Sequence, residues 1–262
     1  MKQIKSFFEP FGTISKTNML ILIAVQIVLA LGLWQWLGAG LIPAPSTIGK
    51  KVVEIIQTGS FWDNFFSSLT LTLKGMFIAL LIALAVSYLS LVPFFKPLAK
   101  FVIKCRYLSL TGLIFAFTLL TNDGSQLKLS LLLFGIVPFF VTSFLSVIDS
   151  IDKQEYELCA TLGMSKWRTL WEVVIIGRLD QVLEVLRQNF AIAWMMITMV
   201  EGISMSEGGL GTLLIKSNKY IDLAGVFAIL VIIFLIGVFF DYILGALRFW
   251  LFPYTKIQLR NK

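Results

Sequence analysis

The chain has 262 residues, of which 58% are hydrophobic and only 14% are charged, and its formal net charge is +7. A soluble domain usually has about 45–50% apolar and about 25% charged residues, so this composition excludes an ordinary soluble protein and favours a lipid bilayer as the solvent. The basic residues lie between long apolar runs and not on one polar face, so we expect no nucleic-acid partner.

The first predicted elements are a short basic segment, 1–18, and an apolar run, 19–37. About 20 apolar residues are long enough to cross a bilayer as a helix, whereas the apolar region of a signal peptide is usually about 7–15 residues. We therefore read 19–37 as a retained span. A loop with Pro43 and Pro45 follows, and then 47–57 has the spacing of an amphipathic helix at the membrane interface.

Long apolar runs continue to the end of the chain. The predicted spans are 19–37, 65–92, 101–120, 127–148, 190–203 and 223–247. The fifth run is short for a span unless it begins inside the charged helix before it. The sequence thus predicts an all-α membrane protein with about six transmembrane helices, a membrane domain 19–247 and a tail 248–262.

The distribution of lysine and arginine predicts the orientation, because such residues are enriched in cytoplasmic loops. With the N-terminus inside, 16 of the 22 basic residues fall in the inside segments 1–18, 93–106, 149–188 and 248–262, and five fall in the outside segments. We expect both termini, and the long charged loop 149–188, to be cytoplasmic.

The sequence of the loop 149–188 predicts two amphipathic helices joined by a turn at 162–165. Gly163 can adopt a positive φ and end the first helix, and Ser165 can cap the second. A short helix lying across the membrane plane can dock in a groove of a soluble partner. The alternative is a pair of interfacial helices anchored by Trp167 and Trp171.

The chain has no histidine and two cysteines, Cys105 and Cys159. Histidine is a common general base and the commonest metal ligand, so its absence disfavours a catalytic or metal site. Both cysteines lie in segments expected near or in the cytoplasm, where thiols stay reduced. We expect neither a disulfide nor a metal site.

The segment Glu-Leu-Cys-Ala-Thr-Leu-Gly at 157–163 resembles the Glu-Ala-Ala-x-x-x-Gly loop of ABC-transporter permeases. Pro43-Ala44-Pro45-Ser46, the stretch 65–75 and Glu201 followed by Gly209-Leu210-Gly211 are similar to segments of nitrate, sulfonate and taurine permeases. The resemblance covers roughly residues 40–250. The chain departs from the pattern at Leu158 and Cys159, which replace alanines, and at 109–112 and 173–176, which lack the family's prolines.

The resemblance implies a permease subunit of an ATP-driven importer in the bacterial cytoplasmic (inner) membrane, carrying a small solute such as nitrate, a sulfonate or taurine. It implies three protein partners: an ATP-binding subunit, a second permease chain and an extracytoplasmic solute-binding protein. ATP and Mg²⁺ would bind the ATPase, because this sequence has no Gly-x4-Gly-Lys-Ser/Thr phosphate loop. The residues expected to couple to that ATPase are Glu157, Cys159, Ala160, Gly163, Met164 and Trp167.

A second set of residues is expected along the translocation path or at its gate: Lys74, Met195, Met196, Glu201, Gly209 and Gly211. A carboxylate at the depth of Glu201 is costly unless it is paired or wet, so it either lines the outer gate or holds the glycine-rich loop by hydrogen bonds. The methionines are more often packing residues. Lys74 snorkels toward water, pairs with acidic groups or attracts an anionic solute.

Three other functions remain open on the sequence. A stand-alone secondary transporter would need ionisable residues in several spans, and only Lys74, Glu201 and Asp241 qualify. A membrane-embedded enzyme usually has clusters of histidine or aspartate at span ends. A subunit that anchors an ATPase without transporting anything would share the coupling loop.

Overall fold

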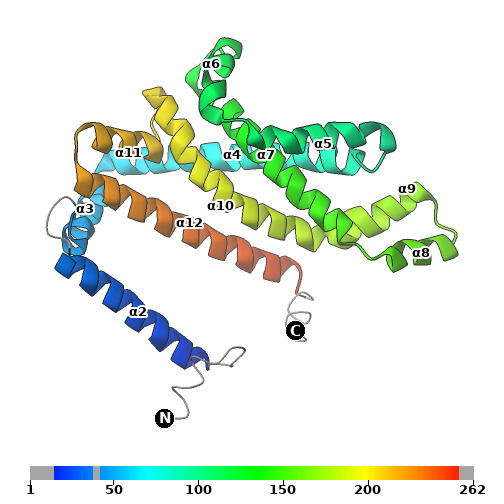
Figure 1. Ribbon diagram of the computed structural model, residues 1–262, viewed down its shortest axis with the longest axis horizontal. Coiled ribbons are helices and arrows are strands. Elements are labelled where there is room, and N and C mark those ends of the chain that lie inside the picture. The colour runs from blue at the N-terminus through cyan, green and yellow to red at the C-terminus, as the bar shows by residue number, and fades with distance from the viewer. Residues whose placement is uncertain (1–14, 38–41, 254–262) are drawn as a thin grey trace.

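The computed structural model describes residues 15–37 and 42–253, and in that part of the chain the regular structure is helical (Figure 1). Most of the predicted segment 1–18 and of the tail 248–262 therefore lies outside the described residues. Four helices are long and apolar enough to cross a membrane: α2 (Lys16–Leu37), α4 (Gly59–Leu89), α7 (Gly124–Asp149) and α12 (Leu223–Leu251). They confirm the first, second, fourth and sixth predicted spans.

Helix ends are set by local sequence signals. Asp123 precedes α7 and its carboxylate accepts a hydrogen bond from the backbone N–H of Gln126 at 2.7 Å. Asp222 caps α12 in the same way, through the N–H of Gly225 at 2.9 Å. Such caps satisfy N–H groups that have no partner within the helix.

The third predicted span, 101–120, is not one straight helix. The chain forms η1 (Pro93–Phe95), α5 (Lys96–Lys104) and η2 (Cys105–Tyr107), and then α6 (Leu110–Leu120) leaves at 113° to them. The break falls at Leu108 and Ser109, whose extended backbone interrupts the helical hydrogen-bond ladder. As Figure 1 shows, α6 projects away from the bundle.

The fifth predicted span, 190–203, is the second half of the longer helix α10 (Leu179–Ile203). The first half carries Asp180, Glu184 and Arg187, and α10 is not among the helices apolar enough to pass as spans. The fifth apolar run is therefore part of a longer helix that begins inside the charged segment before it.

The core lies where α4 and α10 pack against α7, whose Leu132, Ile136 and Phe140 are fully buried. α4 approaches α7 closely at Gly75, where an added Cβ would lie 2.6 Å from Cδ2 of Leu132. On the other side of α10, the indole N–H of Trp194 donates to the backbone carbonyl of Ile233 in α12 at 2.9 Å. Thus α10 joins α7 to α12.

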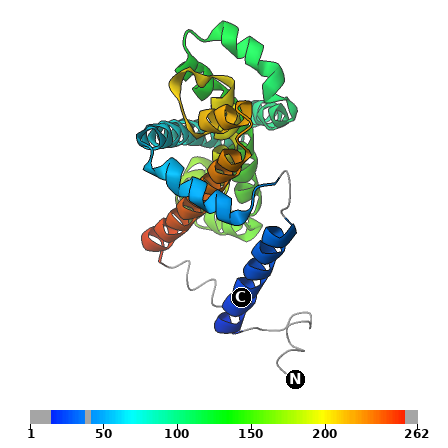
Figure 2. The ribbon, with the colours of Figure 1, turned by 90° about the vertical axis from the view of Figure 1, so that its left-hand side faces the viewer.

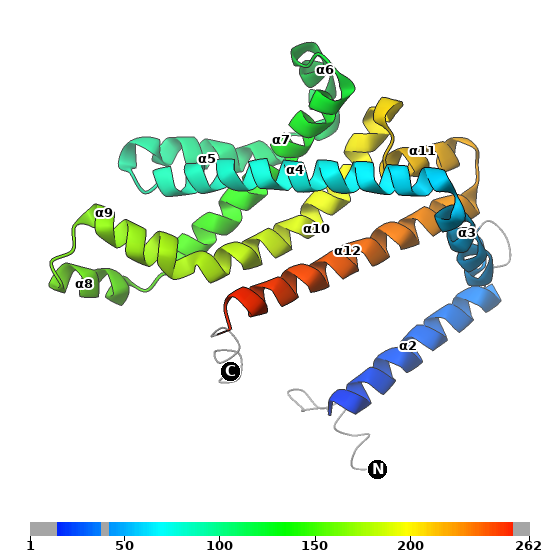
Figure 3. The same ribbon diagram turned by 180° about the vertical axis from the view of Figure 1, so that it is seen from behind.

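One end of the bundle carries α3 (Pro45–Gln57) and α11 (Leu210–Lys219). The opposite end carries α8 (Lys153–Thr161) and α9 (Lys166–Thr169), as seen from behind in Figure 3. α3 packs on α12, and its Ile48 is buried, as the predicted amphipathic pattern requires. α2 stands apart from the bundle in Figure 2, and none of its apolar window is buried.

The close approach at Gly75 gives a test of this packing. Gly75→Ala should lower the thermal unfolding midpoint of the detergent-solubilised protein, because the new methyl group must displace Leu132 from a close-packed core. Gly112→Ala in α6 is the matched control, since nothing lies within 4 Å of its added Cβ. That control should be neutral or stabilising, because alanine has the higher helix propensity. Equal midpoints for the two variants would contradict the packing.

Candidate functional site

The predicted loop 149–188 forms a helical hairpin followed by the first turns of α10. Asp152 begins α8 by accepting from the N–H of Gln154 at 3.1 Å. At the end of α8, Gly163 has a φ of +70°. The N–H of Gly163 donates to the carbonyl of Ala160, and the N–H of Met164 donates to the carbonyl of Cys159, both at 3.0 Å. This pair of bonds is the Schellman motif that glycine commonly closes.

The return arm begins at Ser165, whose hydroxyl accepts from the N–H of Arg168 at 3.3 Å. It continues from α9 through the π-helical turn η3 (Leu170–Ile175) and the 3-10 turn η4 (Ile176–Arg178) into α10. Gly163 and Ser165 thus hold the positions in the turn that the sequence predicted for them.

The hairpin brings the six predicted coupling residues together but does not expose all of them. Glu157, Ala160, Gly163 and Trp167 are exposed, Met164 is half-buried, and Cys159 is only 7% exposed. Cys159 therefore packs toward the chain in this conformation. Sequence reasoning missed Leu158 and Leu162, which are 61% and 70% exposed. Their spacing of four residues places them on one face of α8.

A mostly apolar hollow of about 490 Å³ lies between the hairpin and the turn 91–93. Tyr156, Ala160, Met164 and Trp167 line its hairpin side. Burial raises the pKa of the Tyr156 phenol, so the side chain stays neutral at this wall.

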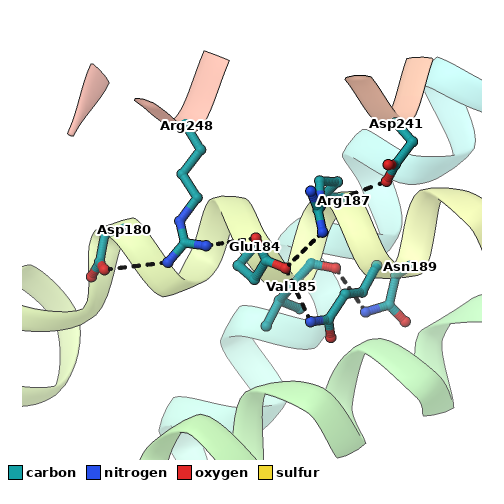
Figure 4. A network of polar contacts seen from close by, with 8 residues as sticks. Asp180, Glu184, Val185, Arg187, Asn189, Asp241 and Arg248 are labelled. Carbon is teal, nitrogen blue, oxygen red and sulfur yellow. Dashed lines mark hydrogen bonds and ion pairs between the residues drawn. The ribbon is translucent and has the colours of Figure 1, made fainter. Parts of the chain in front are cut away.

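Ion pairs join the two arms of the hairpin and, next to its base, join α10 to α12. Arg178 in η4 pairs with Glu155 in α8. One step further along, Arg248 at the end of α12 pairs with Glu184 at 2.7 Å and lies 3.8 Å from Asp180 (Figure 4). In the same network, Arg187 lies 3.3 Å from Glu184 and 3.6 Å from Asp241. These contacts connect the start of α10 with the second half of α12.

The opposite end of the bundle contains a second constellation, centred on Glu201 at the end of α10. Its carboxylate is fully buried and accepts from the hydroxyl of Ser68 at 2.6 Å and from the N–H of Gly211 at 2.8 Å. The Ser68 hydroxyl in turn accepts from the N–H of Leu210 at 2.8 Å. Of the two roles that the sequence left open for Glu201, these bonds favour holding the glycine-rich loop.

The two predicted glycines lie directly against this carboxylate and its helix. Gly209 has a φ of +115°, and an added Cβ would clash with the carboxyl group of Glu201. A Cβ on Gly211 would clash with the backbone of Thr198 in α10. The loop can therefore approach α10 this closely only because these positions lack side chains.

Lys74 and the two methionines occupy different surroundings. Lys74 is exposed and lines a hollow of about 450 Å³ with Lys128. Lys128, which sequence reasoning did not single out, is 2% exposed and donates to the carbonyl of Gly208 at 3.0 Å. Met195 is 66% exposed, whereas Met196 is half-buried, with its sulfur 2.8 Å from where a Cβ on Gly135 would lie. Of the two methionines, only Met195 is placed on an open surface.

Within the described residues, no group of three metal-binding side chains comes together. The candidate site has two parts: the hairpin at one end of the bundle and, at the other, the glycine-rich loop 207–211 bound to Glu201, which we call the pinned loop.

Comparisons with known proteins agree with this architecture. Residues 37–252 match the protein family described as "Binding-protein-dependent transport system inner membrane component". A probable ABC transporter permease protein of Brucella melitensis is 24% identical over 233 residues, which cover 85% of this chain and 92% of that protein. The taurine transport system permease protein TauC of Escherichia coli is 24% identical over 212 residues, which cover 74% of each.

Among solved structures, the crystal structure titled as an amino acid ABC transporter with histidines matches with a TM-score of 0.64. The match covers 75% of this chain and 96% of the other chain, at 19% sequence identity. At this level of identity the match supports the fold.

The pinned loop can be tested by one methyl group. Gly209→Ala should lower the free energy of unfolding by at least about 2 kcal/mol, because alanine is strained at a positive φ and clashes with Glu201. Gly49→Ala in α3, where nothing lies within 4 Å of the added Cβ, is the control. The measurement is thermal unfolding in detergent. A stable Gly209→Ala protein would contradict the described contact.

Proposed function

The chain belongs to the family of binding-protein-dependent transport system inner membrane components, and from that premise we propose that its hairpin, residues 152–178, seats in a separate ATP-binding subunit. The chain then forms part of the path of an importer for a small solute, and ATP with its Mg²⁺ binds to the partner. This arrangement places the hairpin end of the bundle, and both termini, in the cytoplasm. The membrane is the cytoplasmic (inner) membrane of a bacterium.

The observation that carries this proposal is the shape and surface of the hairpin. It lies at one end of the bundle and presents Leu158, Leu162 and Trp167 to solvent, with exposed fractions of 61%, 70% and 71% (Figure 3). Adjacent exposed apolar side chains on a helix with fixed ends suit insertion into a groove of another protein.

The ion pairs at the base of the hairpin support transmission of force. A partner that moves α8 also moves Arg178 through Glu155, and η4 leads without interruption into α10. Arg248 connects that part of α10 to α12. A displacement of the hairpin by a closing ATPase therefore reaches two long helices.

The proposal includes two further partners, and it places one of them at the end of the bundle that carries α3 and α11. A second permease chain completes the path, and an extracytoplasmic binding protein delivers the solute to the end that carries α3 and α11. One hollow is lined by two basic residues, Lys74 and Lys128, and by two acidic residues, Asp63 and Glu207, so it offers charges of both signs to a small polar solute. One relative is named as a taurine permease. The class of solute remains part of the proposal.

The alternative from another class is a stand-alone secondary transporter. Ion coupling at mid-membrane usually depends on ionisable groups that gain and lose a charge. Glu201 is engaged by Ser68 and Gly211, and Asp241 lies near Arg187. These contacts favour structural roles for both carboxylates, so the importer remains the better-supported function. A subunit that anchors an ATPase without transport shares the hairpin, and only a transport assay separates it.

Copurification tests the proposal. The tagged chain, extracted from native membranes in mild detergent, should bring with it an ATPase that contains a phosphate loop. Leu162→Glu should reduce the recovered ATPase by about tenfold or more, because it places a charge in an apolar contact. Gly163→Pro should act similarly, since proline cannot adopt the φ of +70° found at this turn.

Tyr220→Glu is the matched control, because Tyr220 is also a large exposed side chain, 83% exposed, but it directly follows α11, which lies at the opposite end of the bundle (Figure 1). It should leave ATPase recovery unchanged. The coupling proposal fails if no ATPase accompanies the unaltered chain, or if Leu162→Glu and Tyr220→Glu give the same recovery.

A further inference from the structure

A polar groove of about 450 Å³ lies between α7 and α10 at the hairpin end of the bundle. Its lining residues include Thr142, Ser146, Gln181, Glu184, Gln188 and Arg248. None of the residues predicted for the path or gate from the sequence lines it. The groove is therefore a feature separate from the pinned loop and from the hollow beside Lys74.

The depth of this groove makes its polarity informative. Thr142 lies seven residues before the end of α7, which is about 10 Å along the helix axis. α7 is one of the helices long and apolar enough to span the membrane. Hydrocarbon offers no hydrogen bonds, so the Thr142 end of the groove suits water or protein, whereas Gln181, Glu184 and Arg248 lie in segments expected outside the membrane.

The hydroxyl groups of the groove donate hydrogen bonds within their own helix. Thr142 donates to the carbonyl of Pro138 at 2.7 Å, and Ser146 donates to the carbonyl of Thr142 at 3.0 Å. Each hydroxyl oxygen therefore keeps its capacity to accept a hydrogen bond. The groove wall presents acceptors that the helices themselves do not use.

Asn189 provides an independent observation beside the same wall. It is 1% exposed, and its side-chain nitrogen donates to the groove residue Ser143 at 3.2 Å and to the carbonyl of Val185 at 2.9 Å (Figure 4). No donor among the described residues reaches its side-chain oxygen. A buried amide oxygen without a donor costs about 1–3 kcal/mol, so an unsatisfied polar group lies directly behind the groove wall.

One face of α10 leads from the groove toward the pinned loop. Gln181, Gln188 and Met195 follow one another at seven-residue intervals, which places them on one face of the helix. Gln188 and Met195 are exposed. The exposed face of α12 is different, because Phe234, Val238 and Phe239 are 67%, 52% and 60% exposed there and suit hydrocarbon.

We propose that the groove between α7 and α10 is the water-filled, hairpin-end section of the solute path, and that it passes a small polar solute along the Gln181–Gln188–Met195 face of α10. The inference rests on the proposed function, since it takes the bundle as a permease in a bilayer. It assigns the path to residues of α7 and α10 that contact neither the hairpin partner nor the pinned loop.

Labelling of single introduced cysteines tests the assignment. Thr142→Cys and Met195→Cys are placed in the path, and Val238→Cys, midway along α12, is the control on the apolar face. The probe is a cationic, membrane-impermeant methanethiosulfonate added to inside-out vesicles. The unsubstituted chain gives the background from Cys105 and Cys159. Because the thiolate is the reactive form and needs water, Thr142→Cys and Met195→Cys should react at least about tenfold faster than Val238→Cys.

Labelling of Thr142→Cys and Met195→Cys no faster than that of Val238→Cys would overturn the proposal and indicate that lipid or a second chain covers the groove. Fast labelling of Thr142→Cys alone would also overturn it, because a path must continue to Met195. The experiment needs no ATPase. Fast labelling at both positions in a chain that copurifies with no ATPase would thus refute the importer proposal but support the path. Slow labelling in a chain that does copurify with an ATPase would refute the path but support the importer proposal.

Discussion

The hydrogen bonds of the Glu201 carboxylate are the interaction on which the α3 and α11 end of the bundle depends. The carboxylate is fully buried at the end of α10, yet it accepts hydrogen bonds from Ser68 in α4 and from Gly211 in α11. A charge or a strong acceptor that is removed from water must be satisfied by the chain itself. One side chain thereby fixes three helices and the sharp turn between two of them. Nothing larger than glycine fits at Gly209, beside this carboxylate, or at Gly211, beside the backbone of Thr198.

The other end of the bundle is held by a different chemistry. Arg248 and Arg187 bridge acidic groups of α10 and α12, and several of these side chains are partly exposed. Ion pairs in contact with water are individually weak and can exchange partners, whereas a fully buried and satisfied carboxylate cannot. We therefore expect the pinned-loop end to be rigid and the hairpin end to be more easily rearranged. The hairpin end is the one that the proposed ATPase must move.

Much of this architecture could be predicted from local sequence. Continuous apolar runs predicted α4, α7 and α12, and a glycine before a serine predicted the turn at Gly163. The break between α5 and α6 could not be predicted, because Leu108 and Ser109 are neither proline nor glycine, and no local signal marks their extended backbone. The role of Lys128 was missed for a similar reason. Its partner, the carbonyl of Gly208, is 80 residues away in the sequence.

The isolation of α2 has a consequence for biogenesis. No residue in its apolar window is buried, and its described attachments are to α3 and, through the ring contact of Trp34 with Phe227, to α12. Because the bundle core does not include it, α2 can insert into the bilayer separately from the other helices without creating a cavity in their core. The core of the remaining helices can then form independently of α2, and α2 can pack last, against a neighbour in the finished assembly.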